Sequence, residues 1–146
     1  MSIVSFYVLP PTSSTQERYL FTCKLIEKSY RSGCFCYVLT DSPEQSRLLD
    51  DLLWTFRAGS FIPHQLYTGE PPAIEKIILI GSIDPPGGWQ ANVINLSSQC
   101  PQNFRQVERI LEILDNSEAG KAAGRQRYRQ YQQAGLDMAT HAIQQI

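Results

Sequence analysis

Residues 124–135, GRQRYRQYQQAG, gather three arginines and two tyrosines without a single acidic residue. On a helix, Arg125, Tyr128 and Arg129 occupy positions i, i+3 and i+4, so their side chains share one face. Arg127 and Tyr131 form a second pair, four residues apart. A guanidinium group binds a carboxylate through two parallel hydrogen bonds, and a neighbouring phenol ring adds apolar surface and a hydroxyl. The pattern therefore favours a site for an acidic peptide that also carries an apolar or aromatic side chain.

The same stretch also fits an ordinary solvated helix face, which is what most charge-rich helices present to water. Against that interpretation, the window holds no acid, so salt bridges between positions i and i+4 cannot account for its arginines. Whether Arg127 and Tyr131 join the face of Arg125 and Tyr128 is left open.

A second candidate surface lies in residues 52–70, LLWTFRAGSFIPHQLYTGE, where Trp54, Phe56, Phe61, Ile62 and Pro63 crowd together. The Ala-Gly-Ser sequence between them is typical of a turn near the surface. One interpretation is that the aromatic rings fold back and close the core beneath a loop. The other is a hydrophobic anchor for a partner protein, since tryptophan dominates such interfaces and large apolar patches are seldom left exposed without use.

Nucleotide chemistry is the competing class, because α/β sheets bind ligands at the carboxyl ends of their parallel strands. The loop after the first predicted strand has no glycine, whereas a dinucleotide-binding turn needs the G-x-G-x-x-G pattern. Gly87 and Gly88 follow a later strand and offer the best remaining phosphate cradle. However, Pro85 and Pro86 have no backbone N–H to donate, and Asp84 would repel an anion.

Other catalytic chemistry is poorly supported. His64 and His141 are the only histidines, and His64 has no serine or cysteine nucleophile beside it in the sequence, so we interpret both as structural or solvated. Asp50 and Asp51 are neighbours on a predicted helix and point about 100° apart, which is typical of a solvated face rather than a shared proton. We therefore predict no metal site, no cofactor and no catalytic residue.

The four cysteines include neither a CxxC pair nor the compact framework of a small secreted fold. We interpret them as reduced thiols. Cys34 and Cys36 alternate in a predicted strand, so we expect both to face the same way and to be buried.

Length and composition predict one domain over residues 1–146, because a chain of this size buries most of its apolar surface in one core. The 14 acids and 13 basic residues nearly cancel, which argues against direct nucleic-acid binding over the whole surface. The start of the chain, MSIVSFYVLPP, has no basic leader, and its short apolar run alternates. We therefore expect a cytoplasmic protein without a membrane span.

Periodicity predicts strands alternating with helices, and hence a mostly parallel sheet with helices on both faces. Ser14 and Glu17 are spaced as a capping box, and Pro43 suits the first turn of a helix capped by Asp41 or Ser42. The late helix contains Gly120 and Gly124, which weaken it. Strands are expected at residues 2–10, 34–40, 74–81 and 91–97, and helices at 13–33, 41–56, 102–114 and 117–135.

The chain resembles the chi subunit family of bacterial DNA polymerase III from end to end. The resemblance rests on FYVL at residues 6–9, LDDLLWTFRAGSFIPH at 49–64, PPGGWQANVINLS at 85–97 and RQRYRQYQQAG at 125–135. The second and last of these motifs, in this order and at this spacing, are fairly specific. The family implies a Rossmann-like α/β fold without catalysis.

The resemblance also implies partners. Similar proteins pair with the small psi subunit of the clamp loader and bind the acidic C-terminal tail of single-stranded DNA-binding protein, which ends in phenylalanine. A repair helicase is an alternative partner of the psi-facing surface. Relatives carry lysine at the position of Arg129, so the detailed geometry of this pocket can differ here. The residues carried over are Trp54, Phe61 and Pro63 for psi, and Leu114, Arg125, Tyr128 and Arg129 for the tail.

Overall fold

The computed structural model describes residues 2–59 and 61–144. Within them the chain forms a seven-stranded sheet in the order β3-β4-β2-β5-β6-β1-β7, and every paired neighbour is parallel. The strands are β1 (Ile3–Val8), β2 (Tyr37–Leu39), β3 (His64–Leu66), β4 (Ile78–Gly81), β5 (Asn92–Asn95), β6 (Arg109–Ile113) and β7 (Asp137–Ala142). The helices are α1 (Thr15–Arg31), α2 (Pro43–Thr55) and α3 (Glu118–Gln133), with a short 3-10 helix, η1 (Phe104–Gln106).

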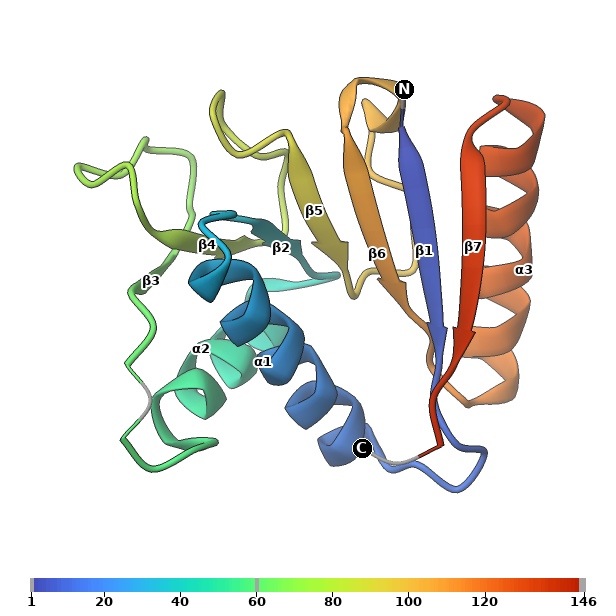
Figure 1. Ribbon diagram of the computed structural model, residues 1–146, viewed down its shortest axis with the longest axis horizontal. Helices are drawn as coiled ribbons and strands as arrows, with labels where there is room; N and C mark the ends of the chain where they lie inside the picture. The colour runs from blue at the N-terminus through green and yellow to red at the C-terminus, as the bar shows by residue number, and fades with distance from the viewer. Residues whose placement is uncertain (1, 60, 145–146) are drawn as a thin grey trace.

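Helices cover both faces of this sheet, as the alternating pattern predicted (Figure 1). One apolar cluster joins α1 and α2 to one face through residues such as Ile26, Leu49 and Ile80. The other cluster lies on the opposite face, where Tyr131 of α3 packs with Phe6 and with residues of the loops. The Rossmann-like α/β architecture is thus confirmed.

Local signals place the first two helices. The Ser14 hydroxyl accepts a hydrogen bond from the Glu17 N–H, and the Glu17 carboxylate accepts one from the Ser14 N–H, so the capping box is formed. Ser42, not Asp41, caps α2, with Pro43 in its first turn. Both helices begin where the sequence predicted.

The helix predicted over residues 102–114 is wrong. This segment contains η1 and then β6, which lies between β5 and β1 in the middle of the sheet. Ile110 and Ile113 are buried, and Leu111 packs against the core from the side facing α1. A strand covered on both faces shows no strict alternation, so its apolar residues also matched a helical repeat.

The sequence pattern did not reveal β3 and β7, which form the two edges of the sheet. Both strands are short or largely exposed, so neither carries a continuous apolar run. The cysteine expectation was wrong in part. Cys36 is buried, but Cys34 is exposed because both residues precede β2, whose first residue is Tyr37.

Candidate binding surfaces

Helix α3 presents Arg125, Tyr128 and Arg129 to solvent, as their spacing predicted. The Tyr128 ring packs on Phe6 of β1, with 5.4 Å between ring centroids, yet 38% of this tyrosine remains exposed. The sheet therefore holds one side of the ring while the other side is available to a ligand. The exposed guanidinium groups of Arg125, one turn before Tyr128, and of Arg129, next to Tyr128, lie on the same helical face.

Leu114, at the end of β6, meets α3 at Gly124. A Cβ atom on Gly124 would lie 2.9 Å from the Leu114 Cδ2 atom, so the glycine permits this close approach. Gly124 and Tyr128 are four residues apart and share a helical face. The four residues carried over for the tail pocket thus lie along one stretch of α3 and the strand end beside it.

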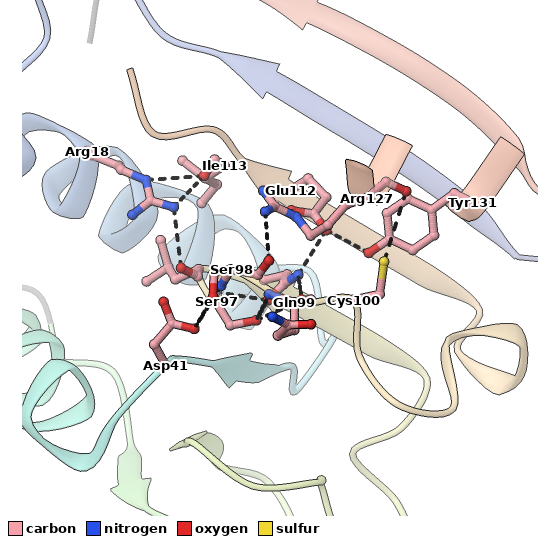
Figure 2. A network of polar contacts seen from close by, with 12 residues as sticks. Arg18, Asp41, Ser97, Ser98, Gln99, Cys100, Glu112, Ile113, Arg127 and Tyr131 are labelled. Carbon is pink, nitrogen blue, oxygen red and sulfur yellow. Dashed lines mark hydrogen bonds and ion pairs between the residues drawn. The ribbon is translucent and has the colours of Figure 1, made fainter. Parts of the chain in front are cut away.

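Arg127 and Tyr131, whose place was left open, are buried and do not join that surface. Figure 2 shows both side chains turned toward Glu112 of β6. The Arg127 Nε atom donates to Glu112 at 3.0 Å, and the Tyr131 hydroxyl donates to the same carboxylate at 2.6 Å. The window itself holds no acid, as the sequence showed, but Arg127 finds its acidic partner in another element, on β6.

The Glu112 carboxylate is fully buried and accepts hydrogen bonds on both oxygens, including one from the Asn95 amide at 2.8 Å. Burial raises the pKa of Glu112, and the Arg127 guanidinium opposes that rise. Burial and the Glu112 carboxylate raise the pKa of Tyr131, so its hydroxyl remains a donor. The network ties α3 to the centre of the sheet.

The same polar network continues into the loop after β5. Arg127 also donates to the Ser98 carbonyl at 3.2 Å, and the Ser98 hydroxyl donates to Asp41 at 2.9 Å. Arg18 of α1 donates to the Ile113 carbonyl at 2.7 Å, next to the C-terminal end of β6 (Figure 2). Backbone groups at the carboxyl edge of the sheet are therefore bound by the chain's own arginines.

The second predicted surface is formed by Trp54 and Phe61, which are 52% and 70% exposed. Their ring centroids are 5.9 Å apart, so the end of α2 and the segment before β3 present one aromatic patch. Pro63, two residues after Phe61, is half-buried. Ser60, the third residue of the predicted Ala-Gly-Ser turn, lies outside the described residues. The interpretation that both rings fold back into the core is wrong.

His64 supports this patch. The histidine is buried, its ring lies 4.5 Å from the Trp54 ring between centroids, and its Nδ1 atom lies 2.6 Å from the Ile62 carbonyl oxygen. Its Nε2 atom lies 3.2 Å from the Asp50 carboxylate. These contacts hold the His64 ring between α2 and the segment before β3. His141 instead stacks on Tyr7 at 5.1 Å.

The glycine loop packs against the sheet through Trp89, and the cavity beside it is small. Trp89 is buried and donates from its indole to the Ile77 carbonyl at 2.8 Å, which holds the loop against the sheet. The cavity beside it, lined in part by Asp84 and Pro85, has a volume of about 20 Å³. That is about the space of one water molecule.

In the described part of the chain, no three His, Cys, Asp or Glu side chains gather as a metal site would require. Residues 2–59 and 61–144 also contain no helix that is both long and apolar enough to cross a membrane.

Comparison with solved structures places the fold among Rossmann-like α/β domains. The crystal structure of T4 UvsW matches 97% of this chain with a TM-score of 0.68 and 12% sequence identity, and the match spans 41% of that chain. At this identity the likeness concerns the fold alone.

Sequence comparison defines the family. The family model described as DNA polymerase III chi subunit, HolC, matches residues 1–139. The chain is 32% identical over its full length to DNA polymerase III subunit chi of Pseudomonas aeruginosa, covering all of that protein. It is 24% identical over 94% of its length to the subunit chi of Haemophilus influenzae, covering 95% of that protein. The chain belongs to the DNA polymerase III chi subunit family.

Proposed function

We propose that this chain is a non-catalytic adaptor of the DNA polymerase III clamp loader, acting in the cytoplasm as a single domain. It pairs with a psi subunit through Trp54, Phe61 and Pro63. It binds the acidic C-terminal tail of single-stranded DNA-binding protein through the α3 surface, and so links the replicase to coated template. The observation that carries the proposal is the pair of separate exposed surfaces, one aromatic and one basic.

The α3 surface suits a carboxylate-rich tail that ends in an aromatic residue. Arg125 and Arg129 supply positive charge, while Tyr128 and Leu114 supply apolar surface for the terminal ring. Charge-assisted contacts contribute about 1.5 to 3 kcal/mol when shielded and less when exposed, so one tail binds weakly. Many tails along one coated strand raise the effective concentration and supply the avidity.

The aromatic surface suits a protein partner that stays bound. Trp54 and Phe61 form an exposed pair whose burial against an apolar face would be favourable, and His64 holds Trp54 from behind. No carboxylate or amine is needed for such a contact, so psi pairing should depend weakly on salt.

Tail binding at the α3 surface is tested by fluorescence anisotropy. A labelled C-terminal peptide of single-stranded DNA-binding protein is titrated with wild type and with Arg129→Glu. Wild type should bind saturably and more weakly as salt rises, and Arg129→Glu should lose at least about tenfold in affinity. Arg105→Glu, an exposed arginine of η1, is the matched control for charge reversal and should bind like wild type. Equal losses in both variants would contradict the socket.

A further inference from the structure

A cavity of about 250 Å³ lies between α1 and the sheet, at the N-terminal ends of β5 and β6. It is on the face opposite α3, far from the tail socket in the fold. We call it the α1 groove. The lining residues that matter here are Leu25, Lys28, Cys36, Ile94, Arg109 and Leu111.

The groove opens toward the N-terminal halves of β6 and β1 and toward β7, which no helix covers on this side of the sheet in Figure 1, whereas α1 packs near the C-terminal ends of β6 and β1. Val4 and Phe6 of β1 face α3 and pack with Tyr131, so the alternate residues Ile3 and Tyr7 face the groove side. Ile3 is 47% exposed and pairs in register with Arg109. Ile3 thus places an exposed apolar side chain on the open sheet past the cavity, between Arg109 of β6 and Asp137 of β7.

Two cations border the apolar floor of the groove from opposite walls. Lys28 comes from α1 and Arg109 from the first position of β6, and both are exposed. None of the residues lining the groove is acidic. Within the described residues, neither cation has a carboxylate oxygen within 4.0 Å. Their charge is thus available to a ligand.

Two hydroxyl groups of the groove already have partners within the chain. The Ser29 hydroxyl donates to the Cys34 carbonyl at 2.6 Å, and the Ser32 hydroxyl donates to the Ser29 carbonyl at 2.8 Å. Burial raises the pKa of the Cys36 thiol to about 12, so the floor stays uncharged at neutral pH. The two cations at the rim suit a negatively charged group of a ligand, and the apolar floor suits an apolar side chain.

We propose that the α1 groove binds a second acidic peptide segment. An apolar side chain of the peptide rests between Leu25 and Leu111, and carboxylates at or next to that residue lie between Lys28 and Arg109. The cavity accommodates one large side chain, and the open floor over Ile3 has room for the chain that carries it. This site is separate from the α3 surface and does not depend on the proposed function.

The test is methyl NMR of the full chain titrated with acetyl-Asp-Asp-Leu, whose C-terminal carboxylate is free. The methyl groups of Ile3, Leu25 and Leu111 report on the groove, whereas those of Leu114 and Met138 report on the α3 side. We expect saturable shifts at the groove methyls in wild type. The affinity obtained from these shifts should be about tenfold lower in the double variant Lys28→Gln/Arg109→Gln.

The matched control is Lys24→Gln/Arg105→Gln, which removes the same charge from exposed positions outside the groove and should bind like wild type. Shifts confined to Leu114 and Met138 would overturn the proposed peptide binding in the α1 groove, but they would be compatible with binding at the α3 surface. Equal affinity for acetyl-leucine and for the tripeptide would also overturn the proposal, because the site would then select a small anion. Shifts at the groove methyls without shifts at Leu114 and Met138 would support binding in the α1 groove. They would contradict binding of this peptide at the α3 surface.

Discussion

Arg125 and Arg127 lie two residues apart on α3 and have opposite roles. Arg125 is exposed and carries charge toward solvent, whereas Arg127 is buried against Glu112. Removing one partner of a buried ion pair leaves the other as an uncompensated charge, which costs far more than losing a surface charge. The two arginines can therefore be separated by experiment.

Arg127→Ala should lower the free energy of unfolding by about 3 to 5 kcal/mol at neutral pH, because Glu112 would stay buried without its cation. Arg125→Ala should change it by less than about 0.5 kcal/mol. Urea unfolding followed by circular dichroism measures both. If Arg127→Ala lowered the free energy of unfolding by less than about 1 kcal/mol, the polar network around Glu112 would not be needed for stability.

The buried thiols predict how stability changes in alkaline solution. Burial raises the pKa of Cys23 and of Cys36 from 9.0 to about 12. Each thiol thus stays protonated in the folded state at pH values where it ionises in the unfolded chain. The contribution of the thiols to the free energy of unfolding is therefore fully present below pH 9 and is lost as the pH rises toward 12. By pH 10 the loss is about 1.4 kcal/mol for each cysteine.

Urea unfolding at pH 8 and pH 10 under reducing conditions checks this expectation. The fall in stability between the two pH values should be about 3 kcal/mol smaller in Cys23→Ala/Cys36→Ala than in wild type. Cys34→Ala is the control, since Cys34 is exposed, and should keep the wild-type fall. An unchanged fall in the double variant would show that the buried thiols do not govern it.

Two glycines of α3 allow close contacts with the residues that follow β6. A Cβ atom on Gly120 would lie 2.5 Å from the Asp115 Cβ, whereas on Gly124 its one tight contact, at 2.9 Å, would be with the Cδ2 end of Leu114, and Arg127 Nη2 would lie at an ordinary 3.8 Å. Asp115 is also fixed by accepting a hydrogen bond from the Ser117 N–H, so it cannot easily move. The sequence reading of both glycines as weak points of the helix missed this packing role.

Gly120→Ala should therefore lower the free energy of unfolding by about 1 kcal/mol or more, because overpacking outweighs a helix-propensity gain of about 1 kcal/mol. Gly124→Ala should be close to neutral, since the Leu114 methyl group can rotate away. Thermal unfolding of the two variants side by side gives the comparison. Stabilisation of both would contradict the close packing of the first turn of α3.

The sequence predicted elements well where a local signal marks them. Ser14, Ser42 and Pro43 set helix starts that the structure reproduces. It failed at β6, where burial on both faces erased the alternation, and at the exposed edge strands β3 and β7. Among the candidate binding residues, it could not separate Arg127 from its neighbours, because Glu112 is 15 residues away in another element.

At the scale of the whole molecule, the two proposed surfaces lie apart. Trp54 ends α2, which packs on one face of the sheet, and the α3 surface lies on the other face beside β1 and β7 (Figure 1). The proposed partners would therefore bind to separate parts of the chain.

Trp54→Ala should weaken binding to a psi subunit at least about thirtyfold, since an exposed tryptophan beside a second ring is a typical interface anchor. Binding of the tail peptide should not change. Leu48→Ala, an exposed leucine six residues earlier on α2, is the matched control. Calorimetric titration of each variant with psi measures the effect, and equal losses in both would contradict a specific anchor.

In the proposed function, one chain connects psi to coated DNA. The most direct test of this connection immobilises psi, loads it with this chain, and measures retention of single-stranded DNA coated with single-stranded DNA-binding protein. Wild type should retain the coated DNA, whereas Arg129→Glu should stay bound to psi and retain almost none. Retention by Arg129→Glu equal to that of wild type, or no retention by a wild-type chain held on psi, would contradict the account.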